Sequence, residues 1–202
     1  MKIFRIICLM IIIPLLSVSL LSCASKQKET DFYFPSKKDV AYSMEASIKG
    51  YSDTQELMLG SKDVVIGKIV SSDRSVKSGS IDYEISVLEI EKVVKGNLSV
   101  GDKINIQETG LKTDDGDVSI GGVPLLKENM RVMLYLRDST TATLDGETSY
   151  AITGCFYGKF FFDNSKTLYP STELSIEHPT PLSDFSKPLP EKEAFDIVTA
   201  TK

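Results

Sequence analysis

The sequence predicts a mainly β domain that carries one or two short helices. Three observations support this prediction. Short runs rich in Val, Ile and aromatic residues recur along the chain, clusters of Gly, Asp, Asn and Ser separate them, and helix signals are confined to two short stretches. The chain has 202 residues, which suits one domain with its own hydrophobic core.

Residues 1–22 have the pattern of a bacterial lipoprotein signal peptide. Lys2 and Arg5 precede an apolar stretch from Ile6 to Leu21, and Ser22-Cys23 follows. Export needs a positive start, an apolar segment and small residues near the cleavage point. We expect cleavage before Cys23 and lipidation of its thiol, which would hold the mature chain on the extracytoplasmic face of the cell membrane. The alternative is an ordinary secretory signal or an uncleaved anchor.

The charge balance argues against nucleic acid and anionic lipid as partners. The chain has a formal net charge of −5, and the signal peptide contributes two basic residues and no acidic ones. The mature chain is therefore more acidic, and its basic residues are scattered rather than gathered in a stripe. We expect the membrane to be contacted through the lipid anchor.

The cysteines predict a domain without disulfide bonds. Cys8 belongs to the signal peptide and Cys23 is assigned to lipid, which leaves Cys155. A catalytic thiol needs a base, and the sole histidine, His178, lies in a proline-flanked segment. We interpret Cys155 as a small hydrophobic residue in the core.

The first elements after Cys23 are a tether and a short helix. Residues 23–50 are predicted to form a lipidated tether because they are mostly polar, although the aromatic residues 32–34 either dock on the domain or lie at the lipid interface. Ser52 with Gln55 resembles a capping box, and Gly60 is a helix terminator. A short helix is expected between them.

Two strands are predicted next. Residues 64–70 are rich in β-branched residues and end at polar residues 71–73. In the following run the apolar residues from Ile81 to Val87 share one parity, whereas Leu88 and Ile90 take the other. This change of phase predicts a β-bulge near Val87, because one extra residue moves the inward face to the opposite parity.

The later strands complete the predicted domain. Ile104 and Ile106 mark a third strand, residues 110–124 a loop, residues 132–136 a fourth strand, and residues 150–162 a final hairpin or two. Five to six evenly spaced strands, one of them long and bent, favour a small closed β-barrel of the oligonucleotide/oligosaccharide-binding (OB-like) kind over residues 51–170. A β-sandwich is the second choice.

Residues 171–202 are predicted to be a Pro-rich extended tail. Four of the chain's prolines lie in this segment and a fifth, Pro170, precedes it, so regular structure is expected only in a short terminal helix from Glu191 to Thr199.

Three blocks of sequence resemble a group of poorly characterised lipoproteins from Gram-positive bacteria. They are residues 63–68, residues 91–96 with 100–102, and residues 150–154 with 158–160. The first two also loosely resemble the barrel of netrin-like domains and metalloprotease inhibitors. The resemblance implies an OB-like fold and a Gram-positive host, with a Gram-negative outer membrane as the alternative. The inhibitors use a disulfide-bonded N-terminal cysteine, so their activity does not transfer to a lipidated Cys23.

The sequence predicts no cofactor or metal. The acidic run from Asp114 to Asp117 lacks the alternating ligand spacing of a dedicated calcium loop and is expected to be a solvated turn. One histidine and one free cysteine do not make a closed zinc site. Gly121-Gly122 lacks the following Gly-Lys-Ser/Thr of a phosphate loop and is interpreted as a turn.

Two further features of the sequence are candidate functional sites. Glu89 and Glu91 share one strand face and are expected to be outward charges rather than a glycosidase pair. In the aromatic run from Phe156 to Phe162, alternation would turn Phe161 outward, where Tyr157 joins it. Core packing explains most of this run, and the pair is the candidate interaction surface.

These observations favour a lipid-anchored extracytoplasmic binding or interaction protein, and no catalytic residue is assigned. The partner expected is an envelope protein or glycan. The alternatives are a carboxylate-using hydrolase of envelope polymers and an inhibitor of an extracellular protease.

Overall fold

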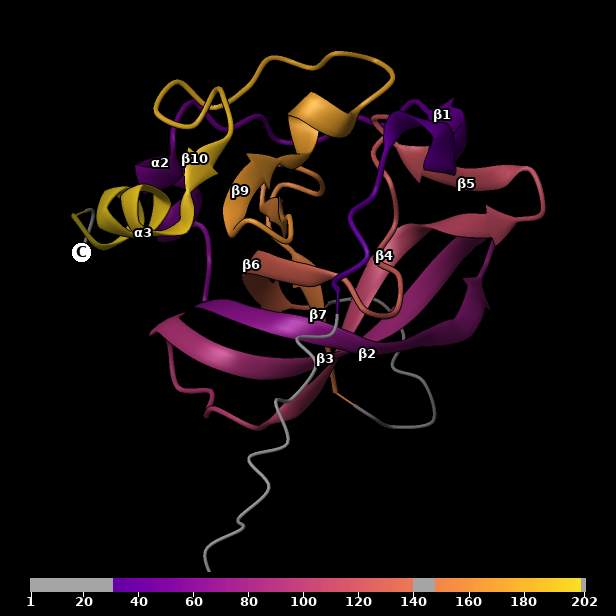
Figure 1. Cartoon of the computed structure of the whole chain (residues 1–202). Helices are drawn as coiled ribbons and strands as arrows, with labels where there is room; N and C mark the ends of the chain where they lie inside the picture. The colour runs from indigo at the N-terminus through magenta and orange to yellow at the C-terminus, as the bar shows by residue number, and fades with distance from the viewer. Residues whose placement is uncertain (1–30, 140–147, 201–202) are drawn as a thin grey trace, which may run out of the picture. The chain divides into compact units, whose positions relative to one another are not determined.

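The computed structural model describes residues 31–139 and 148–200 (Figure 1). Strands hold 47% of the residues and helices 14%, which confirms the mainly β prediction. The signal peptide, Cys23 and the first part of the predicted tether lie outside the described residues. Within those described, no helix is both long and apolar enough to cross a membrane.

The described chain contains ten strands, more than the five to six predicted. The two α-helices are α2 (Thr54–Leu59) and α3 (Glu191–Ala200), and two short 3-10 helices are η1 (Lys37–Asp39) and η2 (Ser171–Leu174). The strands are β1 (Val40–Met44), β2 (Asp63–Ser78), β3 (Ile81–Lys95), β4 (Lys103–Thr113), β5 (Gly116–Ile120), β6 (Arg131–Asp138), β7 (Ser149–Ile152), β8 (Lys159–Phe162), β9 (Thr167–Pro170) and β10 (Leu189–Pro190).

The strand pairings run around β2, β3, β4, β7 and β6 and return to β2. All of them are antiparallel except the pairing of β7 with β4, which is parallel. From β4 the sheet continues to β5 and β1, and from β6 it continues to β8, β9 and β10. In Figure 1, β1 and β5 lie at one side of the domain, whereas α2, α3 and β10 gather at the other.

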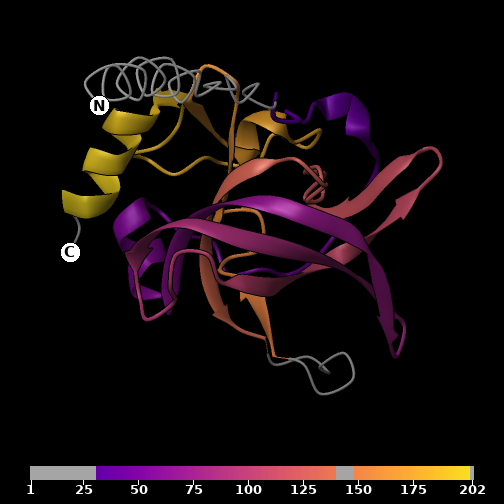
Figure 2. The same ribbon diagram turned by 60° about the horizontal axis from the view of Figure 1, so that its bottom comes forward.

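The long β2–β3 pair is bent by several β-bulges (Figure 2). A β-bulge is found near Val87, as predicted, because the ladder shifts register on each side of this residue, but the bulge is on the partner strand. The extra residues lie in β2, opposite Val87. Gly67 lies in this bent region, where a Cβ would come within 2.3 Å of the Glu89 carbonyl oxygen. A side chain at this position would hold the two strands apart.

Both faces of the central strands are buried. One apolar cluster contains Ile66, Tyr135 and Phe160 and packs against α2 and α3, while the other contains Val65, Leu134 and Phe161. Because successive side chains of a strand point to opposite faces, β2, β6 and β8 each supply both clusters. The core is therefore two-sided, and alternation does not separate inward from outward positions on these strands.

The prediction that residues 23–50 form a tether is wrong for the described part of that segment. The Tyr33 N–H donates to the Asn129 carbonyl at 3.0 Å, and the Phe34 and Tyr169 rings meet edge to face with centroids 4.7 Å apart. β1 then pairs in parallel with β5. Polar composition did not prevent docking, because a few aromatic and backbone contacts are sufficient to order the segment.

The Pro-rich tail predicted over residues 171–202 has its terminal helix confirmed, and between η2 and β10 it contains no helix or strand. It differs from the prediction because its apolar side chains enter the core instead of only crossing the surface. The apolar residues between the prolines cover the cluster around Tyr135, and Phe185 and Val198 are fully buried there. α3 begins at Glu191, as the sequence indicates. α2 is confirmed too, but its N-cap is Asp53, whose side chain accepts the Glu56 N–H.

The loop predicted over residues 110–124 is partly a hairpin of β4 and β5. The predicted hairpin over residues 150–162 does not form. Instead β7 and β8 both pair with β6, one after the other along the same strand. The turn of residues 153–158 lies between these two pairings and contributes to the cavity described below.

Candidate functional site

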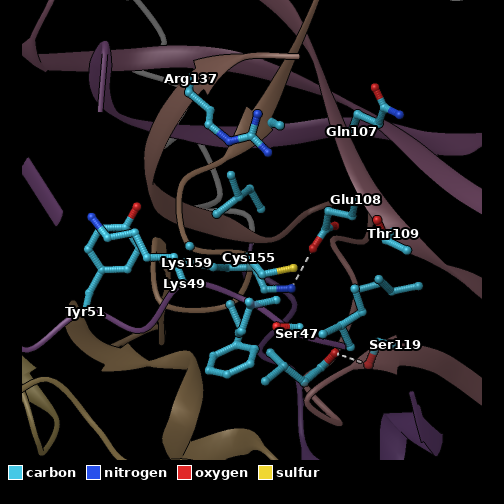
Figure 3. A pocket seen from close by; sticks show the side chains of 18 residues that line it. Ser47, Lys49, Tyr51, Gln107, Glu108, Thr109, Ser119, Arg137, Cys155 and Lys159 are labelled. Carbon is cyan, nitrogen blue, oxygen red and sulfur yellow. Dashed lines mark hydrogen bonds and ion pairs between the residues drawn. The ribbon is translucent and has the colours of Figure 1, made fainter. Parts of the chain in front are cut away.

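A cavity of about 310 Å³ lies among β4, β7, the turn before β8 and the segment after β1 (Figure 3). β4 supplies Gln107, Glu108 and Thr109, and Lys159 begins β8. The remaining lining residues are Ser47, Ile48, Lys49, Tyr51, Ser119, Ile120, Val123, Leu125, Arg137, Ala151, Ile152, Gly154, Cys155 and Phe156. Apolar and polar groups thus share one hollow, as is usual for small-ligand sites.

A buried ion pair forms part of the wall. Lys159 Nζ lies 2.6 Å from Glu108 Oε1, and Lys159 and Glu108 are only 3% and 8% exposed. The ammonium also donates to the Pro124 carbonyl at 2.7 Å, and the second carboxylate oxygen accepts the Leu126 N–H at 2.8 Å. These hydrogen bonds compensate the desolvation of both charges and hold them in fixed positions.

A second charged group supports the loop of residues 121–127 beside the cavity. Asp117 Oδ2 accepts the Leu125 N–H at 2.9 Å and lies 3.3 Å from Lys127 Nζ. Lys127 reaches Asp39 at 3.0 Å. Burial raises the pKa of Asp117, and the contacts with the Leu125 N–H and Lys127 oppose that rise. The cavity wall is therefore tied to the docked N-terminal segment.

Two cationic side chains lie at the more exposed end of the lining. Arg137 is exposed, donates to the Asp138 carbonyl at 3.4 Å and forms no ion pair among the described residues. Lys49 lies 3.4 Å from Glu56 and 4.7 Å from the centroid of the Tyr51 ring. The lining thus contains three cationic side chains and one carboxylate.

Cys155 lies in the cavity wall in a left-handed backbone conformation. Its φ is 59°, directly after Gly154 at 64°. Figure 3 shows its sulfur near the Glu108–Lys159 pair. The pKa of this thiol is raised, mainly by burial. His178 does not line the cavity and instead contacts Lys37, so the structure does not bring this histidine and the cysteine into one site.

The predicted interaction surface of Tyr157 and Phe161 is wrong as an exposed pair. Phe161 is fully buried, because β8 packs against an apolar cluster on each face. Tyr157 is half-buried, and its ring packs against the rings of Phe156 and Tyr51 at centroid distances of 4.6 and 6.2 Å.

The acidic residues and the glycine pair singled out from the sequence do not line the cavity. Asp114 and Asp115 are exposed in the β4–β5 turn, apart from the buried Asp117, and no group of metal-ligating side chains gathers within the described part of the chain. Glu89 pairs with Lys103 at 3.4 Å, and Glu91 pairs with Arg131 at 2.7 Å. Gly121 and Gly122 have positive φ values, as expected of the predicted turn.

The sequence did not identify Glu108, Lys159 or Arg137 as site residues. A signal was present in Lys159, a lysine within an aromatic run, because a charge at such a position must be paired if it is buried. Its partner lies 51 positions away and on a strand with which β8 has no ladder. A scan against protein-family models and a search of curated proteins found no match to this chain.

Proposed function

We propose that this chain is a lipid-anchored binding protein on the extracytoplasmic face of a bacterial membrane, and that the cavity beside β4 is its ligand site. The observation that carries the binding role is the cavity itself, where the buried Glu108–Lys159 pair holds polar groups in place beside apolar walls. Because these polar groups are already held in place, ordering them costs little free energy when a ligand binds.

The closed order of the strand pairings supports an OB-like barrel as the scaffold. β2, β3, β4, β7 and β6 form five consecutive pairings that end where they began. Five strands are the number found in OB-folds, which bind their ligands on one flank of the barrel and its adjoining loops. The cavity likewise lies on one flank, along β4 and β7.

The geometry of the cavity favours binding over hydrolysis. A glycosidase needs two carboxyl groups in unequal environments. The lining contributed by residues 31–139 and 148–200 has one, Glu108, which accepts hydrogen bonds from Lys159 and from a backbone N–H. The thiol of Cys155 has a raised pKa, contrary to what a nucleophile needs. Neither the hydrolase nor the protease inhibitor is favoured by an observation on this site.

The anchoring part of the proposal rests on the sequence of residues 1–23 and has its own test. Cys23→Ala should move the protein from the membrane to the soluble extracytoplasmic fraction, or leave its signal peptide uncleaved. In either case mass spectrometry should find a chain without the mass of the acyl groups. Unchanged membrane attachment together with unchanged mass would refute lipidation.

The binding part is tested by screening the full chain, in a non-ionic detergent, against small polar and charged fragments by ligand-observed NMR. Ala151→Phe places a ring in the cavity lining and should abolish binding of any fragment found. Thr180→Phe, at an exposed position outside the lining, should leave it unchanged. If every fragment binds both variants equally, this cavity is not the binding site.

A further inference from the structure

We infer that the cavity binds a small organic anion, with a carboxylate or phosphate group at Arg137 and an apolar body against Phe156. This inference rests on the proposed binding function and gives it a ligand class. It is argued from charge, from the hydrogen-bond donors that the cavity offers, and from the shape and chemistry of its walls.

The cavity is a local concentration of positive charge in an acidic protein. The chain has a net charge of −5, yet among the described residues the lining contains Lys49, Arg137 and Lys159 against one carboxylate, that of Glu108. Glu108 neutralises Lys159, and Glu56, just outside the lining, is 3.4 Å from Lys49. Arg137 is the cation that keeps its charge uncompensated among the described residues, so an anion is the complementary ligand.

Arg137 has the donor geometry for an oxyanion. A guanidinium carries five N–H donors in a planar fork that matches a carboxylate or phosphate in a two-point contact. Within the described part of the chain, the one hydrogen bond of this side chain goes to the Asp138 carbonyl and is long, at 3.4 Å. The fork therefore retains donors for a ligand, and a lysine here would supply the charge without the paired geometry.

Lys159 offers a further donor from inside the cavity wall. Its ammonium has three N–H groups, and Glu108 and the Pro124 carbonyl accept two of them. Lys159 also lines the cavity, which leaves one donor for a polar atom of the ligand. Since this group is nearly fully buried, a hydrogen bond to it is stronger than one made in water.

The remaining walls fit the apolar body of such a molecule. Phe156, Ile152 and Ile48 are among the lining residues, and Tyr51 adds a second aromatic ring. A volume of about 310 Å³ is at the lower end of the range for small-molecule pockets. A single ring or short chain that bears one acidic group suits these dimensions better than a polymer segment.

The test compares acids with their neutral amides. Phenylacetate, phenylacetamide and phenyl phosphate are titrated into the full chain in non-ionic detergent, together with further acid–amide pairs of similar size. Binding is measured by calorimetry, and also as protection of Cys155 from alkylation, located by mass spectrometry of its peptide. Protection is informative because Cys155 lines the cavity.

We expect the best acids to bind at least about tenfold more tightly than their amides. The reason is that the amide replaces the charged hydrogen bond of the acid by a neutral one. Arg137→Gln should remove this preference for acids, whereas Arg137→Lys, which keeps the positive charge, should retain part of it. Lys187→Gln, which removes one exposed charge outside the lining, should keep the preference. A phosphate that binds more tightly than the carboxylate would identify phosphate monoesters as the ligand class.

The failures of the two proposals look different. If acids and amides protect Cys155 equally, the cavity binds ligands but not through an anion contact, and the present inference is overturned while the binding function stands. The inference is also overturned if the preference for acids persists in Arg137→Gln. If no acid or amide binds or protects Cys155 at millimolar concentration, both the anion site and the cavity's binding role are refuted.

Discussion

Lys159 and Glu108 join two strands that share no hydrogen-bonded ladder. Lys159 begins β8, Glu108 lies within β4, and their charged atoms are 2.6 Å apart. β8 pairs with β6 and β9, whereas β4 pairs with β3, β5 and β7. The ion pair therefore joins directly, in the wall of the cavity, two strands that backbone hydrogen bonds connect only through other strands, such as β7 and β6.

Breaking this pair on one side should destabilise the domain. We expect Glu108→Gln or Lys159→Met to lower the free energy of unfolding by about 3–5 kcal/mol, because each leaves a buried charge without its partner. Urea denaturation measures the loss. As a control, Lys103→Gln breaks an exposed pair with Glu89 and should cost less than about 1 kcal/mol. The double variant at Glu108 and Lys159 should lose less than the sum of the two single losses, and strictly additive losses would contradict the coupling.

Gly96 should tolerate no side chain. Its φ is 102°, and a Cβ would come within 1.9 Å of the Asp63 Oδ1 atom, which accepts the Asn97 N–H. Gly101 has a similar φ of 89° but open space around it. We expect Gly101→Ala to cost about 1–2 kcal/mol for the backbone conformation alone, and Gly96→Ala to cost clearly more. Equal thermal shifts for the two variants would mean that Asp63 yields without cost.

Asp39 should control the docking of the N-terminal segment. Burial raises the pKa of this carboxyl group, but hydrogen bonds outweigh it and lower the pKa from 3.8 to about 2. The donors are the Tyr33 hydroxyl, the Ser36 N–H and the Lys127 ammonium. Because the pKa is lower in the folded state, the carboxylate contributes stability above pH 3.8, and this contribution is lost as the pH falls toward 2.

Asp39→Asn mimics that loss at neutral pH. Hydrogen exchange measured by mass spectrometry should become faster in peptides from residues 32–44 and remain unchanged in β6. Glu45→Gln, an exposed neighbour of the same segment, serves as the control and should leave exchange unaltered. Unchanged exchange in Asp39→Asn would show that β1 pairing and the aromatic contacts are sufficient to hold the segment.

The thiol of Cys155 should react slowly. Burial raises its pKa above the ordinary 9.0, so the thiolate fraction at neutral pH is small. Alkylation by iodoacetamide should be slower than that of free cysteine at pH 8, and the rate should still be rising above pH 9. Peptide mass spectrometry isolates this site from the other cysteines. A rate plateau below pH 8 would instead indicate an activated thiol.

Several strands were predictable because their signals are local. β2, β3, β4 and β6 have β-branched or alternating sequences, and the phase change near Val87 indicated the bend of the β2–β3 pair. β9 was missed because it is short, although it forms a hairpin with the preceding β8. β1 and β10 were missed because they are short and pair with segments that lie farther away in the chain. Long-range pairing of this kind has no signature in the local sequence.

The site was less predictable, and β8 shows why. Alternation puts Lys159 and Phe161 on one face and Phe160 on the other, and a lysine on the first face suggests that it meets solvent. In the structure both faces are covered, and Lys159 is compensated by Glu108 from another part of the sheet. Alternation along this strand therefore predicted the wrong environment for Phe161, because both faces of the strand are buried.

Local sequence was sufficient to predict the mainly β class, a β-bulge near Val87 and the short helices α2 and α3, because periodicity, bulges and caps depend on neighbouring residues. Only the tertiary structure decided that residues 32–44 and 171–200 belong to the domain and that Glu108, Lys159 and Arg137 line one cavity. These relationships arise from contacts between segments far apart in the chain, where burial and charge pairing depend on which segments meet.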